Sequence, residues 1–185
     1  MKRNVEIIHD VDGKSIVVIH DIRFRGKRRI NWWEVEAFLK EYVGNCYEIA
    51  ETAEKVYIGR DFPDEFAGSM NMAKLKGAIA KAKANASQGV GELLEVAWDK
   101  RHIANRKSKH KQNAKYGWYR YQSRFALPVY SENGILQRYN IFHIQMLVRL
   151  DANGKAYLYD MLNIKKEPST PHCLTRTVKN PVPFK

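Results

Sequence analysis

The C-terminal half of the chain alternates between apolar and polar residues in three runs. Residues 117–129, 138–149 and 155–164 each alternate with a period of two, which is typical of strands with one buried face. Asn-Gly pairs at 133–134 and 153–154 lie between the runs and favour tight hairpin turns. The pattern therefore predicts a three-stranded antiparallel meander.

Two-residue turns would fix the register of this meander and place Arg124 directly opposite His143. One face would then be the core, and it carries Tyr119, Tyr121, Phe125, Phe142, Ile144, Met146, Val148, Tyr159 and Met161. The other face, named the open face here, carries Arg120, Gln122 and Arg124 opposite Leu147, Gln145 and His143. We expect this open face to be basic and exposed to solvent.

Residues 1–66 are expected to form a small N-terminal α/β lobe. Apolar runs at 5–8 and 15–24 flank Asp12-Gly13 and predict a hairpin. Apolar residues at helical spacing predict an amphipathic helix over 31–43, with Asn31 and Glu34 as a capping box. Short strands at 47–50 and 56–59 would complete the lobe.

Residues 67–185 are expected to form a second domain in which helices precede the antiparallel sheet. Residues 71–88 are rich in Ala and Lys and predict a helix, and residues 92–98 predict another helical run. The first helix has an apolar stripe of Met72, Leu75, Ile79, Ala82 and Ala86. Lys74, Lys81 and Lys83 lie off the stripe and are expected in solvent. The fold class predicted for the whole chain is α+β.

Positive charge is concentrated in the second half of the chain. The 185 residues carry a formal net charge of +12. Residues 1–99 hold 15 basic and 16 acidic side chains, whereas residues 100–185 hold 17 basic and 4 acidic ones. Such an imbalance favours an anionic partner.

The segment 100–124 combines this charge with aromatic rings. It contains nine Lys or Arg residues, no acidic residue, and the rings of Tyr116, Trp118, Tyr119 and Tyr121. Basic groups neutralise phosphates and aromatic rings stack on unpaired bases, which predicts binding of single-stranded nucleic acid. The alternative is a solvated basic loop leading into an ordinary strand. Within the segment, the candidates for nucleic-acid binding are Lys107, Lys109, Lys111, Lys115, Trp118, Arg120 and Gln122.

Several chemistries have no support in the sequence. Cys46 and Cys173 are far apart, which argues against a disulfide framework and a structural zinc site. The second half of the chain has no paired carboxylates, and the sequence has no P-loop, GxGxxG or GxSxG, so we expect no metal or other cofactor. The sequence has no apolar run of membrane-spanning length and no signal-peptide core, so a cytoplasmic location without membrane contact is expected.

The residue types on the open face suit metal-independent cleavage of RNA. In that reaction the 2′-hydroxyl attacks the adjacent phosphorus, a histidine transfers the proton, and Arg or Lys stabilises the phosphorane oxygens. His110 or His143 would transfer the proton, and Arg120, Arg124 and Lys166 would contact the phosphate. The alternatives are an exposed loop histidine at 110 and a half-exposed sheet histidine at 143.

Several short motifs resemble a domain of the large polyvalent proteins of phages and conjugative elements, associated with the barnase/EndoU/colicin/RelE-like nuclease group. They are Lys115-Tyr-Gly-Trp-Tyr-Arg-Tyr121, Arg124-Phe-Ala-Leu-Pro128, Arg138-Tyr-Asn140, Lys155-Ala-Tyr-Leu-Tyr-Asp160 and Asn163-Ile-Lys-Lys-Glu167. The resemblance implies helices before an antiparallel sheet of about four strands, and metal-free cleavage in many members. The chain has three clear strands here, which leaves a fourth to the proline-rich tail or to an upstream segment. Thr170 in that tail is a further candidate at the phosphate.

The sequence thus predicts a metal-independent ribonuclease of a phage or mobile genetic element, with RNA as its partner. One alternative is a nucleic-acid-binding module without an assembled catalytic pair. Another is a protein-interaction factor of a mobile element that binds an acidic host surface. A larger polyvalent protein or an inhibitor is a possible further partner.

Overall fold

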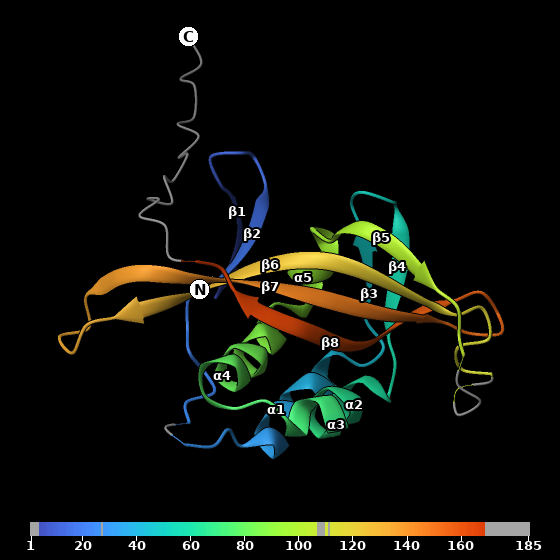
Figure 1. Cartoon of the computed structure of the whole chain (residues 1–185), viewed down its shortest axis with the longest axis horizontal. Coiled ribbons are helices and arrows are strands. Elements are labelled where there is room, and N and C mark those ends of the chain that lie inside the picture. The colour runs from blue at the N-terminus through green and yellow to red at the C-terminus, as the bar shows by residue number, and fades with distance from the viewer. Residues whose placement is uncertain (1–3, 27, 107–109, 111, 169–185) are drawn as a thin grey trace, which may run out of the picture.

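The fold is built on a single eight-stranded sheet. The computed structural model describes residues 4–26, 28–106, 110 and 112–168 (Figure 1). Its strands are β1 (Val5–His9), β2 (Ser15–Ile19), β3 (Cys46–Ile49), β4 (Glu54–Ile58), β5 (Trp98–Ile103), β6 (Trp118–Tyr130), β7 (Leu136–Leu150) and β8 (Ala156–Lys166). They are ordered β1-β2-β6-β7-β8-β4-β3, and β5 pairs with β6 as a branch.

The three strands predicted for the C-terminal half are confirmed as β6, β7 and β8. They pair antiparallel in chain order, and Arg124 lies opposite His143 as expected. The core face is largely as expected, with Tyr121, Phe125 and Met146 almost completely buried. Tyr159 is an exception, because a register shift in the β7–β8 pairing places Leu158 opposite Val148 and buries Leu158 instead.

The prediction of a purely antiparallel sheet is wrong, because the sheet is mixed. β2 pairs parallel with β6, and β4 pairs parallel with β8. The hairpin signals were local and gave no information about which distant strand each hairpin would join. The broad class, α+β, is confirmed. Strands from residues 1–66 and from residues 67–185 share this one sheet, and residue 66 falls within α2 (Phe62–Gly68).

Helices cover one side of the long strands. Figure 1 shows α1 (Trp32–Leu39), α2, α3 (Met70–Ala73) and α4 (Gly77–Ala86) below β6, β7 and β8. Short 3-10 segments, η1 (Lys40–Tyr42) and η2 (Ser87–Gly89), follow α1 and α4, and α5 (Val90–Glu95) contributes Val90, Leu93 and Leu94 to the core. Within the described residues, none of the helices has the length and apolar character needed to cross a bilayer.

The helix predicted over 71–88 is divided, and the following helical run is shorter than predicted. Gly77 has a φ of +56°, a left-handed conformation that separates α3 from α4. α5 ends at Glu95, and Trp98 begins β5, a strand that the sequence pattern did not predict. Trp98 therefore belongs to the sheet and pairs with Gln122.

Lys83 was expected in solvent, but it is buried in the core. Its side chain is 1% exposed, and its Nζ lies 2.9 Å from Oδ1 of Asp160, which is 2% exposed. The same Nζ lies 4.6 Å from the centre of the Phe66 ring. Burial raises the pKa of Asp160 to about 6 and lowers the pKa of Lys83, despite their mutual attraction. The pair is thus held where both charges are costly, and removing one partner leaves the other uncompensated.

We predict that Lys83→Met and Asp160→Asn each reduce the free energy of unfolding by about 3–5 kcal/mol, the usual cost of breaking a buried ion pair. The Lys83→Met/Asp160→Asn double variant should lose less than the sum of the two, because neither partner is left charged. Urea unfolding of the four proteins measures this. Strict additivity would contradict the coupling.

The same variants should show a specific pH dependence. A carboxyl group whose pKa is raised on folding contributes stability below its unfolded pKa, near 3.8, and loses that contribution as the pH rises through about 6. Without Lys83 this loss becomes larger. Between pH 4 and pH 7, Lys83→Met should therefore lose more stability than the double variant, which lacks the Asp160 carboxyl group.

Candidate active site

The open face of β6 and β7 is only partly covered by the rest of the chain. Arg120, Gln122, His143 and Gln145 are all half-buried, whereas the residues that alternate with them point into the core. β5 extends this face on one side, since Trp98 lies beside Gln122 in the β5–β6 pairing. The face is therefore largely polar, carries the Trp98 ring beside Gln122, and is partly exposed to solvent.

Arg124 is fully engaged by two carboxylates. Its Nε and Nη2 donate to the two oxygens of Glu167 at 2.7 and 3.1 Å, and its Nη1 donates to Oδ2 of Asp10 at 2.8 Å. Burial acts to lower the pKa of Arg124, but the two carboxylates outweigh it and the pKa is raised. The expectation that Arg124 contacts phosphate remains untested, but its charge is already compensated within the protein.

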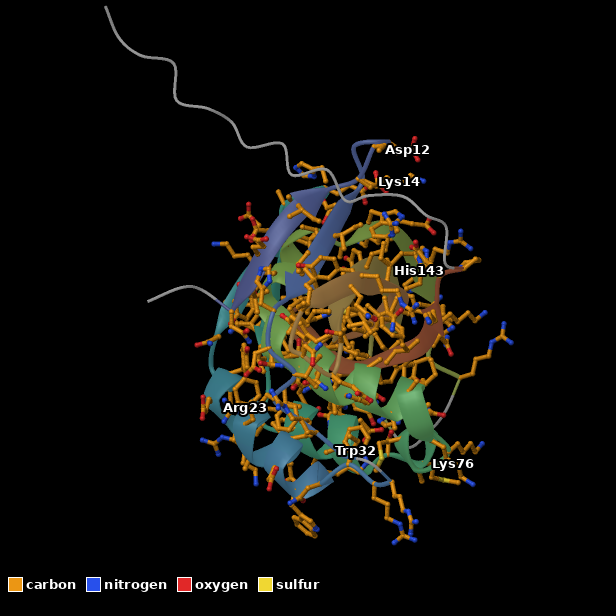
Figure 2. The ribbon with its side chains drawn as sticks, turned by 90° about the vertical axis from the view of Figure 1, so that its left-hand side faces the viewer. Asp12, Lys14, Arg23, Trp32, Lys76 and His143 are labelled. Atoms are coloured by element: carbon orange, nitrogen blue, oxygen red, sulfur yellow. The ribbon has the colours of Figure 1, made fainter. Side chains whose placement is uncertain are left out.

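His143 shares Glu167 with Arg124. Its Nε2 lies 2.8 Å from Oε1 of Glu167, and its side chain is 45% exposed. When Nε2 carries the hydrogen, it donates to the carboxylate and leaves the lone pair on Nδ1. The Trp98 ring lies edge-on at 6.5 Å. We name Asp10, Arg124, His143 and Glu167 the Arg124 cluster. Figure 2 shows His143 on the same side of the molecule as Asp12 and Lys14 at the β1–β2 turn.

A bulge in β8 brings Glu167 to this face. Met161 pairs with Met146 and Leu162 with Gln145, but the next pairing is Lys165 with His143. One extra residue is thus accommodated near Asn163, whose φ of 51° is left-handed. From this point the alternation is shifted by one residue. Lys165 and Glu167 therefore share the face of His143, and the Glu167 N–H donates to the carbonyl of Ile141.

The bulge also changes which lysine accompanies His143. Lys166, the residue predicted at the phosphate, pairs with Phe142, a core residue. Lys165 pairs with His143 and is exposed. Sequence reasoning missed both Lys165 and Glu167, because an uninterrupted alternation assigns each of them to the opposite face.

His110 lies far from His143. Its ring packs against Trp118 and Tyr159, with ring centres 5.2 and 5.6 Å apart. Trp118 and Arg124 are six residues apart on β6, which corresponds to about 20 Å along a strand. The two candidate histidines therefore cannot act on the same phosphate, and His110 belongs to an aromatic cluster at the other end of the strand.

The predicted nucleic-acid-binding residues are not equally placed. Lys115 and Tyr116 are exposed, and Nζ of Lys115 lies 5.5 Å from the centre of the Tyr116 ring. Trp118 is half-buried and donates from Nε1 to Oδ1 of Asn105 at 3.4 Å. Arg120 has a buried Nε without a hydrogen-bond partner in the part of the chain that the structure describes. Lys107, Lys109, Lys111 and Thr170 lie outside the described residues.

Acidic residues from the N-terminal half neutralise part of the basic segment. Lys100 pairs with Glu54, which also accepts from the Tyr121 hydroxyl.

Among the described residues, no group of three or more His, Cys, Asp or Glu side chains is placed to hold a metal ion. The described face therefore offers a histidine, a carboxylate and cations for proton and phosphate chemistry.

Comparison with models of protein families, with curated proteins and with solved structures finds no match to this chain.

We predict that Arg124→Gln reduces the free energy of unfolding by about 3 kcal/mol, because it leaves Asp10 and Glu167 facing each other without a cation. Arg101→Gln, which breaks an exposed pair with Asp99, is the control and should cost less than about 1 kcal/mol. Urea unfolding compares them, and equal losses would contradict a special role for Arg124.

The free energy of unfolding of Arg124→Gln at acidic pH gives a second measurement. Burial acts to raise the pKa of Asp10, but hydrogen bonds from Arg124 and the backbone outweigh it and the pKa is lowered. A lowered carboxyl pKa contributes stability above the unfolded pKa and loses it as the pH falls through the folded one. The difference between wild type and Arg124→Gln should therefore shrink as the pH falls below about 4.

The bulge predicts the effect of substitutions at Asn163. Asn163→Gly should be tolerated, because glycine adopts a left-handed φ without strain, whereas Asn163→Val should cost about 1–2 kcal/mol. Thermal unfolding of both variants measures this. Equal stability of the Val and Gly variants would show that β8 does not require the bulge.

Proposed function

We propose that the protein cleaves RNA without a metal ion at His143 and Glu167. The 2′-oxygen attacks the adjacent phosphorus as its proton leaves to a base, and the bond from phosphorus to the 5′-oxygen breaks. The products are a 2′,3′-cyclic phosphate and a 5′-hydroxyl, which receives a proton. His143 transfers the proton, Glu167 orients its ring, and Lys165 stabilises the phosphorane oxygens.

The observation that supports this proposal is the half-exposed His143 with Nε2 2.8 Å from Glu167, on a polar sheet face beside an exposed lysine. A carboxylate behind a histidine fixes the tautomer and the direction of the ring. Arg124 holds both oxygens of that carboxylate, so the orientation is supported from a second side.

Membership of the barnase/EndoU/colicin/RelE-like group is part of the proposal. Its support is the antiparallel unit β6-β7-β8 with helices packed on one face, together with the motifs that resemble the polyvalent-protein domain. In this assignment Glu167, the last residue of the motif Asn163-Ile-Lys-Lys-Glu167, is functional.

A second candidate function is nucleic-acid binding without cleavage. It is favoured by the engagement of Arg124 and Glu167 in an ion-pair cluster that also joins β6, β8 and the β1–β2 hairpin. Such a cluster has a structural use that needs no catalysis. Cleavage assays separate the two functions.

We predict that purified wild-type protein cleaves RNA in the presence of EDTA and leaves 2′,3′-cyclic phosphate ends. His143→Gln should reduce the rate by about 10²–10⁴, the usual contribution of general acid–base catalysis. Lys165→Gln should also reduce it, with little change in the free energy of unfolding, since Lys165 is exposed.

His110→Gln is the matched control, because it removes the other candidate histidine about 20 Å away along β6. It should leave the rate of cleavage unchanged. Loss of cleavage in His110→Gln with full activity in His143→Gln would refute this assignment. Intact RNA together with salt-sensitive binding would instead support the binding function.

A further inference from the structure

The open face continues beyond His143 as a row of side chains along β6. Arg124 lies beside His143, Gln122 lies beside Trp98, and Arg120 lies beside Arg101 of β5. Alternate residues of a strand are about 6.6 Å apart, so the row from Arg124 to Arg120 is about 13 Å long. Arg120 is therefore placed to contact a part of a ligand next to the part at His143.

Arg120 lacks the internal partners that Arg124 has. Its Nε is buried without a hydrogen-bond acceptor among the described residues, and its charge is in no ion pair there. The side chain as a whole is half-buried, so an anionic ligand oxygen at its exposed part would compensate the charge. Arg101, its neighbour, adds a cation whose ion pair with Asp99 lies at the surface.

Trp98 supplies the aromatic surface between these cations and His143. It is half-buried in β5, and its ring centre is 6.5 Å from that of His143. Gln122, its neighbour on β6, adds an amide without charge. An indole ring stacks on a base only when that base is unpaired, so this arrangement fits a single strand and not a duplex.

We propose that Trp98, Arg101, Arg120 and Gln122 form a strand track that binds the unpaired nucleotides next to the phosphate at His143. This inference rests on the proposed function for the position of the scissile phosphate. It makes the substrate a single-stranded RNA several nucleotides long, with a base on Trp98 and a neighbouring phosphate on Arg120.

The test compares kcat/KM on a dinucleoside monophosphate and on a single-stranded octanucleotide. Arg120→Gln should lower kcat/KM for the octanucleotide by roughly 10- to 150-fold, the value of hydrogen bonds to a charged group, and leave the dinucleotide unchanged. Trp98→Ala should lower the octanucleotide value by roughly 5- to 150-fold, and Trp98→Phe by less. Arg138→Gln, an exposed arginine opposite Val129, controls for loss of charge alone.

A binding measurement separates failure of the track from failure of cleavage. Fluorescence anisotropy with a 2′-O-methyl octanucleotide, which cannot be cleaved, should show weaker binding by Arg120→Gln and Trp98→Ala, with partial recovery in Arg120→Lys. If this holds while wild type cleaves nothing, the track stands and the proposed function fails. The track would be overturned if Arg120→Gln and Trp98→Ala lowered kcat/KM equally on both substrates. It would also be overturned if these variants were folded and bound the 2′-O-methyl octanucleotide as tightly as wild type.

Discussion

The arrangement of side chains on the open face depends on the guanidinium group of Arg124. Arg124 connects three segments that are distant in sequence: β6, the β1–β2 hairpin through Asp10, and the end of β8 through Glu167. The backbone pairing of β2 with β6 is short, covering Val17 with Phe125 and Val18 with Ala126. The side-chain link therefore adds to the core packing of Val17 and Ile19 in holding the hairpin beside the site.

The register of the central strands could be predicted from the sequence, whereas the site itself could not. Alternation has a period of two, and two-residue Asn-Gly turns would place Arg124 opposite His143. The pairing is correct although the first connection is longer than two residues, because a register shift between Val129 and Tyr130 offsets the difference. The bulge at Asn163 then shifted the following alternation by one residue, which moved Lys165 and Glu167 onto the open face. A signal was present: strict alternation from the buried Met161 assigns a polar Asn163 to the core face, a conflict that a bulge resolves.

The distribution of charge shows a similar limit. Residues 100–124 contain no acidic side chain, yet the folded chain brings Glu54 to Lys100 and Asp10 to Arg124. In the core, Lys83 pairs with Asp160, although the helical pattern places Lys83 in solvent. Counting charges along the chain predicts the net field, but it cannot predict which cations stay uncompensated. That depends on the pairing of β2 with β6 and of β4 with β8, which no local pattern encodes.

The Arg124 cluster would serve the proton transfer that we propose at His143. Asp10 and Glu167 carry two negative charges, and Arg124 compensates one of them. Oε1 of Glu167 lies within hydrogen-bond distance of both Arg124 and His143, so the same oxygen that holds the fold together also directs the ring. Half exposure is common for a histidine on a sheet face. What favours the proposed catalysis is the contact of this exposed ring with a carboxylate that Arg124 also holds.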